Sequence, residues 1–277
     1  MKLGGPIHAD FSNPEEWISY LSKEGYEAAY CPVDASKDEE KIEAYSKAAE
    51  KENVIIAEVG AWSNPISPEE ETRKEAIEKC KEKLELADKI GARCCVNIAG
   101  SRGEKWDGPH HDNFAEETFQ LIVETIREII DYVEPKRTYY TLETMPWIYP
   151  NSPDEYLELL EEVDRDRFAV HFDPVNIICS PKRYFNHETL IKEFIEKIGP
   201  HIKSCHLKDI KLRKKLTVHL NEVRPGKGKL NFHLLLKEID KLKQDLPVML
   251  EHLSDEKEYR KAADHVRSIG EKLEINL

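Results

Sequence analysis

Residues 138–173, TYYTLETMPWIYPNSPDEYLELLEEVDRDRFAVHFD, contain in one stretch the pattern that decides the fold. An apolar run typical of a strand, 138–143, is followed by Ser152-Pro153-Asp154 and then by a second run of the same type, 168–173. The serine precedes a proline and an acid, which suits the positive end of a helix. The stretch therefore predicts one strand and helix, followed by the strand of the next unit.

The same alternation runs through the whole chain and predicts eight strands. They are expected at residues 2–8, 26–31, 54–59, 94–99, 138–143, 168–173, 202–207 and 247–251. Several runs, such as Val54-Ile55-Ile56-Ala57, are apolar on both faces, as parallel strands between helices and a barrel interior require. Segments of helical period lie between them, and the clearest are expected within 76–90 and 119–133.

The number of units favours a closed barrel. Eight units in 277 residues allow about 35 residues each, the size typical of a (β/α)8 TIM barrel. A doubly wound open sheet would need a glycine-rich phosphate loop, and neither GxGxxG nor GxxxxGKS/T occurs in the sequence. No linker or low-complexity tract divides the chain, so residues 1–277 are expected to form a single (β/α)8 TIM barrel domain of the α/β class.

Composition limits the partners and the location of the protein. The chain has 41 Lys+Arg against 54 Asp+Glu and a formal net charge of −13, which disfavours binding to nucleic acid. No stretch reaches the roughly 18 uninterrupted apolar residues of a membrane span, so no membrane contact is expected. Residues 1–6 contain no signal-peptide core, and a cytoplasmic location is expected. The six cysteines lack CxxC spacing and are expected to be reduced, buried thiols.

Four successive strands of the second half each end in a side chain that can bind a metal ion. These side chains are Glu143, Asp173, His206 and Glu251. They are expected to meet at one rim, because functional groups in this fold lie at the carboxyl ends of the strands. Any one alone is more often a cap or loop contact, but three buried carboxylates together need a cation between them. Mixed oxygen and nitrogen donors favour one divalent ion, Mn2+ before Mg2+, Co2+ or Zn2+.

Short motifs surround these four side chains. They read Leu142-Glu143-Thr144, His171-Phe172-Asp173-Pro174, Cys205-His206-Leu207-Lys208-Asp209 and Leu250-Glu251. In the first half of the chain, His8 and Ala57-Glu58-Val59-Gly60-Ala61-Trp62 with Asn64 belong to the same pattern. Together they resemble the xylose isomerase-like TIM-barrel superfamily, in its sugar phosphate isomerase and epimerase branch. The resemblance implies that the four strand-end side chains are the metal ligands.

The resemblance also implies a metal-dependent isomerase or epimerase acting on a sugar, polyol or keto-sugar. Such an enzyme removes a proton next to a carbonyl and forms a metal-stabilised enediolate. Glu143 and Glu251 match the pair that the family uses as acid and base, so they are the expected catalytic residues. An inosose-type dehydratase, or a lyase that eliminates a C–O or C-glycoside bond, would use the same site, because each begins with the same proton abstraction.

Two further functions stay open at the level of sequence. A non-catalytic carbohydrate-binding subunit would bind metal or sugar without turnover. An abasic-site endonuclease is disfavoured by the net charge and by Asn176, which stands where both the endonucleases and the ketose epimerases usually carry a histidine. The substitution removes a second-metal ligand or a substrate contact.

Seven side chains are predicted to bind a small carbohydrate or polyol substrate. They are His8, Glu58, Trp62, His171, Asn176, Lys208 and Arg224. Lys208, Arg224 and nearby Lys227 would also hold the phosphate of a phosphorylated sugar, and Trp62 would stack on a sugar face. The alternatives are structural: a buried histidine, a solvated loop lysine, or an indole packed in the core. A homo-oligomer is compatible with the sequence.

Overall fold

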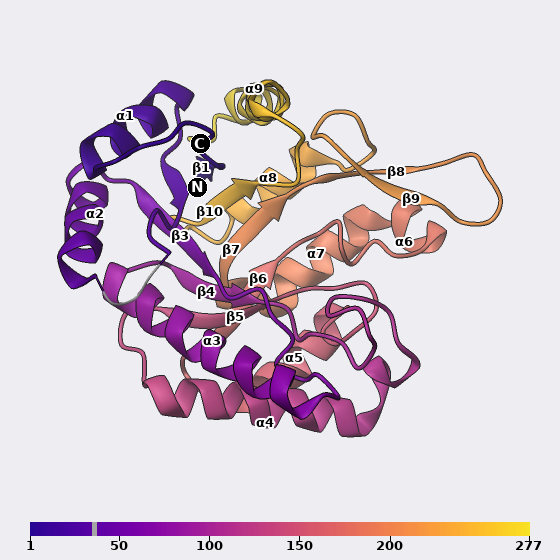
Figure 1. Cartoon of the computed structure of the whole chain (residues 1–277). Coiled ribbons are helices and arrows are strands. Elements are labelled where there is room, and N and C mark those ends of the chain that lie inside the picture. The colour runs from indigo at the N-terminus through magenta and orange to yellow at the C-terminus, as the bar shows by residue number, and fades with distance from the viewer. Residues whose placement is uncertain (35–37) are drawn as a thin grey trace.

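The structure is a computed structural model that describes residues 1–34 and 38–277. Within these residues, eight parallel strands close into a barrel in the order β1-β10-β7-β6-β5-β4-β3-β2, and helices surround it (Figure 1). The closed parallel sheet confirms the predicted (β/α)8 TIM barrel. The carboxyl ends of all eight strands therefore meet at one end of the barrel.

All eight predicted strands are present. Their bounds are β1 Lys2–Gly4, β2 Ala28–Tyr30, β3 Ile55–Gly60, β4 Cys94–Asn97, β5 Tyr139–Glu143, β6 Phe168–Phe172, β7 Ile202–Leu207 and β10 Pro247–Leu250. The helices are α1 Pro14–Glu24, α2 Glu39–Lys51, α3 Glu70–Ile90, α4 Glu116–Val133, α5 Pro153–Val163, α6 Pro181–Phe185, α7 His187–Ile198, α8 Phe232–Asp240 and α9 Glu256–Leu273. Two short 3-10 helices are η1 His111–Phe114 and η2 Gly199–His201.

The helices predicted within 76–90 and 119–133 correspond to α3 and α4. The predicted helix start at Ser152 is also confirmed, since its side chain accepts the backbone N–H of Glu155 at 3.3 Å and Pro153 is the first helical residue. Capping groups of this kind satisfy the free N–H groups of the first turn.

The first strand is shorter than predicted. β1 ends at Gly4 instead of residue 8, because Pro6 has no N–H to donate to a neighbouring strand. Gly4 pairs with Ala28 of β2, and a Cβ at Gly4 would collide with the carbonyl oxygen of Ala28. The absence of a side chain lets the two strands approach at this point in the barrel wall.

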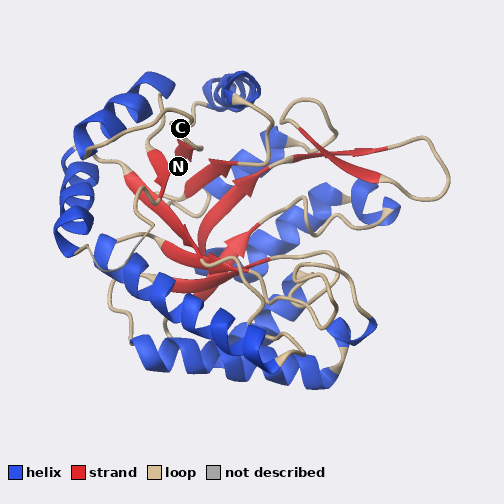
Figure 2. Cartoon of the chain, viewed as in Figure 1, coloured by secondary structure: helices blue, strands red, loops and turns tan. Residues whose placement is uncertain are grey.

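A hairpin that the sequence analysis missed extends from the barrel (Figure 2). Its strands, β8 Asp209–Leu212 and β9 Leu220–Val223, pair antiparallel, with Asp209 opposite Val223. Between them, residues 213–219 are exposed. The strands were missed because each has only four residues, two of them polar, so they lack the apolar runs that mark the barrel strands.

Asp209 anchors the base of this hairpin. Its buried carboxylate accepts backbone N–H groups from Gly226 at 3.0 Å, Gly228 at 2.7 Å and Leu230 at 2.9 Å. Gly226 has a φ of 86°, and a Cβ on Gly228 would collide with the carboxylate. The two glycines therefore let the chain wrap closely around one acidic side chain.

The cysteines are thiols, as predicted, in the part of the chain that the structure describes. Cys80, Cys94, Cys95 and Cys205 are buried, whereas Cys31 is half-buried and Cys179 is exposed. No helix among the described residues is both long enough and apolar enough to cross a membrane.

Replacing Asp209 by alanine is expected to lower the free energy of unfolding by roughly 2 to 4 kcal/mol, because four backbone donors, those of Gly226, Gly228, Leu230 and the adjacent Ile210, lose their shared acceptor. Urea unfolding followed by circular dichroism measures the change. Asp240→Ala is the control, since Asp240 is a partly exposed aspartate paired with Lys243 on the outer surface, and its change should stay within about 0.5 kcal/mol. Equal stability of the two variants would contradict the anchoring role.

Candidate active site

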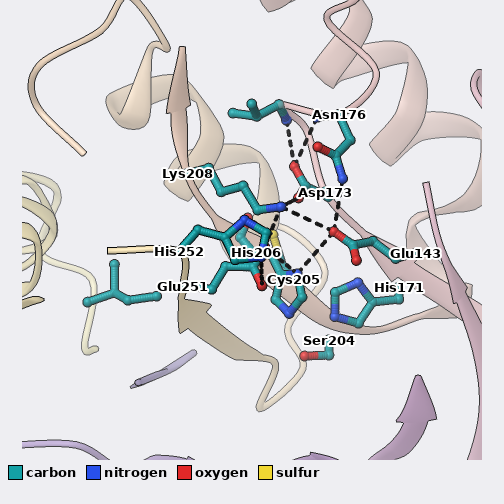
Figure 3. A network of polar contacts seen from close by, with 12 residues as sticks. Glu143, His171, Asp173, Asn176, Ser204, Cys205, His206, Lys208, Glu251 and His252 are labelled. Carbon is teal, nitrogen blue, oxygen red and sulfur yellow. Dashed lines mark hydrogen bonds and ion pairs between the residues drawn. The ribbon is translucent and has the colours of Figure 1, made fainter. Parts of the chain in front are cut away.

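Four side chains converge at the carboxyl end of the barrel (Figure 3). Glu143 is the last residue of β5, and Asp173 directly follows β6. His206 lies on β7, and Glu251 directly follows β10. One potential ligand atom from each lies within 4.8 Å of the others, so the structure brings the four strand-end side chains together.

The ammonium group of Lys208 lies among the three carboxylates (Figure 3). Its Nζ is 2.7 Å from Asp173 Oδ2 and 3.3 Å from Glu143 Oε1, and it also contacts Glu251 Oε1. His206 Nδ1 lies 2.9 Å from Glu251 Oε1 and 3.2 Å from Glu143 Oε1. None of these five side chains is more than 12% exposed, so two nitrogen groups balance three carboxylates away from water. We call these five residues the carboxylate cluster.

Burial and the close neighbouring charges shift the pKa values of the acidic side chains in the carboxylate cluster. Burial raises the pKa of Asp173 to about 7, and the carboxylates of Glu143 and Glu251 add to the effect, whereas the ammonium of Lys208 opposes it. Burial would also raise the pKa of Glu143, but Lys208 and His206 hold that pKa well below its usual range. Carboxylates packed this closely are ionised only when positive charge lies among them.

The carboxylate cluster fits a divalent cation. Asp173 Oδ2 and Glu251 Oε1 are buried and make no hydrogen bond with the described residues, although Lys208 lies within ion-pair distance of both. Lys208, and for Glu251 Oε1 also His206, supplies the only nearby positive charge among the described residues, which is the role a bound divalent ion would take. Three carboxylates and one imidazole form a donor set suited to ions such as Mn2+ or Mg2+.

A second polar layer lies deeper in the barrel. Glu58, on β3, places Oε1 2.9 Å from His206 Nε2 and Oε2 2.9 Å from His171 Nε2. The Ser204 hydroxyl donates to the same Oε2 at 3.0 Å. Burial alone would raise the pKa of Glu58, but His206 and His171 together hold it below its usual range. This deeper layer supports the His206 ring on the edge that faces away from the three carboxylates.

A cavity of about 560 Å³ opens onto the carboxylate cluster. Glu143, Lys208 and Glu251 reach it from the cluster. Its other walls are largely aromatic or apolar and include Tyr30, Trp62, Trp106, Met145, Trp147 and Tyr259. Apolar rings beside a few convergent polar groups are typical of a pocket for a small molecule, and the flat faces of indoles suit sugar rings.

Three of the seven predicted substrate contacts line the cavity: Trp62, Asn176 and Lys208. Asn176 also donates its Nδ2 to Glu143 Oε1 at 3.0 Å, which fixes the orientation of that carboxylate. Glu58 and His171 instead belong to the deeper layer, with side chains that are at most 1% exposed. They face His206 from inside the barrel.

The other two predicted contacts lie outside the cavity lining. His8 packs on Tyr259, with ring centroids 5.1 Å apart, in a small neighbouring hollow. Arg224 donates its Nε to Glu258 Oε2 at 2.8 Å, at the start of α9. In the described part of the chain, neither side chain faces the carboxylate cluster.

Four polar residues of the cavity lining were not among the predicted site residues: Lys105, Asp107, Glu222 and His252. His252 places Nδ1 3.2 Å from Glu222 Oε2 and Nε2 3.6 Å from Glu251 Oε2. His252 immediately follows a predicted ligand, so its position after the strand end was an available signal. Glu222 belongs to β9, and it could not be placed without the hairpin.

Comparison with known proteins agrees with this fold. The profile of the xylose isomerase-like TIM barrel family matches residues 18–269. None of the curated proteins compared matches the sequence.

Several solved structures are similar along nearly the whole chain. The probable 3-DHS dehydratase AsbF of Bacillus anthracis has a TM-score of 0.71 and 19% identity, over 97% of this chain and 98% of AsbF. D-psicose 3-epimerase of Clostridium cellulolyticum H10, with D-tagatose, has a TM-score of 0.68 and 16% identity, over 97% and 99% of the two chains. A xylose isomerase-like TIM barrel protein of Mycobacterium smegmatis, in complex with magnesium, has a TM-score of 0.67 and 14% identity, over 98% of this chain and 96% of that protein. At these identities the likeness shows the fold alone.

Replacing Lys208 by methionine tests whether its ammonium occupies the place of a metal ion. The metal-free variant is expected to lose roughly 3 to 5 kcal/mol of stability, since buried carboxylates lose their counter-charge. Its affinity for Mn2+ is expected to rise at least about tenfold, because an internal competitor is gone.

Urea unfolding in EDTA and calorimetric titration with Mn2+ measure the two effects. Lys81→Met is the matched control: Lys81 is also buried, but it pairs with Glu78 and Glu128 on the helical shell, so Mn2+ affinity should not change. Unaltered stability and Mn2+ affinity in Lys208→Met would contradict the competition.

Proposed function

The chain belongs to the xylose isomerase-like TIM barrel family, and we propose that it is a divalent-metal-dependent epimerase or isomerase of an unphosphorylated carbohydrate or polyol. Glu143, Asp173, His206 and Glu251 are the proposed metal ligands. Glu143 and Glu251 are also the proposed acid and base. Mn2+ is the first ion to test, because the mixed oxygen and nitrogen donors do not select strongly between divalent ions.

The observation that carries the proposal is the placement of Glu143 and Glu251. Their strands, β5 and β10, are separated in the barrel by β6 and β7, so the two carboxylates approach the cavity from different directions. Both also lie close to His206 Nδ1. Two carboxylates that flank one substrate-sized space can remove a proton from one side of a carbon and return it on another.

The proposed reaction begins with loss of a proton from the carbon next to a carbonyl. One glutamate takes this proton, and the other returns a proton to the same carbon in epimerisation or to its neighbour in isomerisation. A bound divalent ion would supply electrostatic stabilisation of the negative charge on the substrate oxygens. Asn176 holds Glu143 by its hydrogen bond, while the aromatic walls exclude water and orient the sugar ring.

The charges around the cavity favour an uncharged substrate. Lys105 pairs with Asp107 at 2.9 Å, and Lys208 is surrounded by carboxylates. Arg224 is paired with Glu258 outside the cavity lining. A phosphate group would therefore find acidic side chains and cations that are already paired, whereas neutral hydroxyl groups can use both the donors and the acceptors.

A dehydratase is the second candidate, and His252 is the observation that favours it. Its ring lines the cavity beside Glu251, with Nε2 3.6 Å from Glu251 Oε2. The pKa of His252 is raised, mainly by its hydrogen bond to Glu222, although burial acts in the opposite direction. A protonated imidazole here could donate to a departing hydroxyl group after the same first proton abstraction.

Incubation with Mn2+ in deuterated water, followed by NMR, tests the proposal on ketoses, inososes and keto-glycosides. An epimerase or isomerase is expected to introduce solvent deuterium at carbon while the substrate keeps its number of oxygen atoms. Loss of water from the substrate would instead identify the dehydratase. Metal and sugar binding without deuterium exchange or product would contradict both enzymes and favour a carbohydrate-binding subunit.

Glu143→Gln and Glu251→Gln test the two proposed proton carriers. Each variant keeps an oxygen that can bind metal but loses its basic carboxylate, so deuterium exchange is expected to fall about 100- to 10,000-fold. The metal content measured on the same samples should fall much less. Glu238→Gln is the control, because Glu238 is a buried glutamate of α8 outside the site. Normal exchange in both site variants would show that another group moves the proton.

A further inference from the structure

Glu58 reaches across the barrel to the proposed metal ligand His206. It lies on β3, four strands away from β7 in either direction around the closed sheet. Its side chain is 1% exposed and does not line the cavity. A carboxylate buried this deeply needs hydrogen-bond donors, and it finds them on His206, His171 and Ser204.

These contacts determine where the imidazole protons lie. An ionised carboxylate offers only acceptor positions, and each oxygen of Glu58 lies 2.9 Å from the Nε2 of one histidine. Both Nε2 atoms must therefore carry hydrogen. Nδ1 of His171 is buried and makes no hydrogen bond with the described residues, which agrees with a proton on the other ring nitrogen.

The same arrangement determines which atom of His206 faces the carboxylate cluster. Nδ1 points between Glu143 and Glu251, at 3.2 and 2.9 Å from their nearest oxygens. In the structure, Nδ1 also carries a proton and faces these carboxylates as part of a charged imidazole. When a divalent ion displaces that proton, the hydrogen held on Nε2 leaves the lone pair of Nδ1 facing the place where the four proposed ligands meet. The His171 ring packs against the His206 ring, with centroids 4.1 Å apart at 69°, and limits its rotation.

We propose that Glu58 is a positioning residue that holds His206 with hydrogen on Nε2, so that Nδ1 is the atom that binds the divalent ion. The inference rests on the proposed metal centre and assigns roles to residues that do not touch the metal. His171 and Ser204 complete the support by holding Oε2 of Glu58 in place. Without Glu58, hydrogen on Nδ1 could bond to Glu143 or Glu251 and block the lone pair.

The position of hydrogen on His206 can be read by long-range proton–nitrogen NMR on the whole protein loaded with diamagnetic Zn2+. The ring proton Hδ2 couples strongly to Nε2, so the spectrum distinguishes the two nitrogens. Hydrogen on Nε2 and a zinc-shifted Nδ1 are expected. Zinc bound with hydrogen on Nδ1 would overturn the positioning role but leave the proposed metal centre intact.

Variants at Glu58 test the effect on metal affinity. Glu58→Leu removes both acceptors, and Zn2+ affinity is expected to fall roughly 10- to 100-fold. Glu58→Gln keeps one acceptor oxygen and should restore part of the loss. Glu238→Leu is the matched control, since it also replaces a buried glutamate, and it should bind Zn2+ like the unmodified protein.

Each outcome decides a different claim. A folded Glu58→Leu variant with normal Zn2+ affinity would overturn the inference. If that variant does not fold, the position of hydrogen in the unmodified protein decides the question by itself. Failure of the unmodified protein to bind any divalent ion would instead overturn the metal centre of the proposed function, and the inference with it.

Discussion

The site depends on one electrostatic constraint: Glu143, Asp173 and Glu251 place three carboxylates in a nearly water-free space at the carboxyl end of the barrel. Such a group is stable only when positive charge lies within it, because burial and mutual repulsion both oppose ionisation. In the structure, Lys208 and His206 supply that charge. In the proposed enzyme, a divalent ion would supply the same charge at the centre of the three carboxylates.

The site residues at the strand ends could be predicted because the same pattern of apolar runs that defines the barrel also determines where these side chains lie. Apolar runs located the strands, and in a parallel barrel the last polar residue of each strand faces the same rim. The rule placed Glu143, Asp173 and His206 correctly relative to one another, without any information about contacts. It also identified Trp62 as a wall residue, since the residues that follow a strand form the loops around the opening.

The rest of the site depends on how deep each side chain lies inside the barrel, which the sequence pattern does not specify. His171 and Ser204 lie two residues before Asp173 and His206, so alternation gives them the same face, but one layer of about 6.6 Å deeper along the strand. Sequence alone did not show that this layer is closed off from the cavity. Nor did it show that the ammonium of Lys208 lies among the three carboxylates, or that Asp209 fixes a hairpin, because both depend on contacts between distant segments. Strands of four residues are too short for an alternating pattern to identify them.

The most direct test of the account is a crystal structure of the protein soaked in Mn2+, with anomalous diffraction recorded at the manganese edge. The account predicts one strong anomalous peak within bonding distance of Glu143, Asp173, Glu251 and Nδ1 of His206, with the ammonium of Lys208 displaced from its place among the carboxylates. An ammonium that stays among the carboxylates, with manganese absent from the cluster or bound elsewhere, would contradict the account.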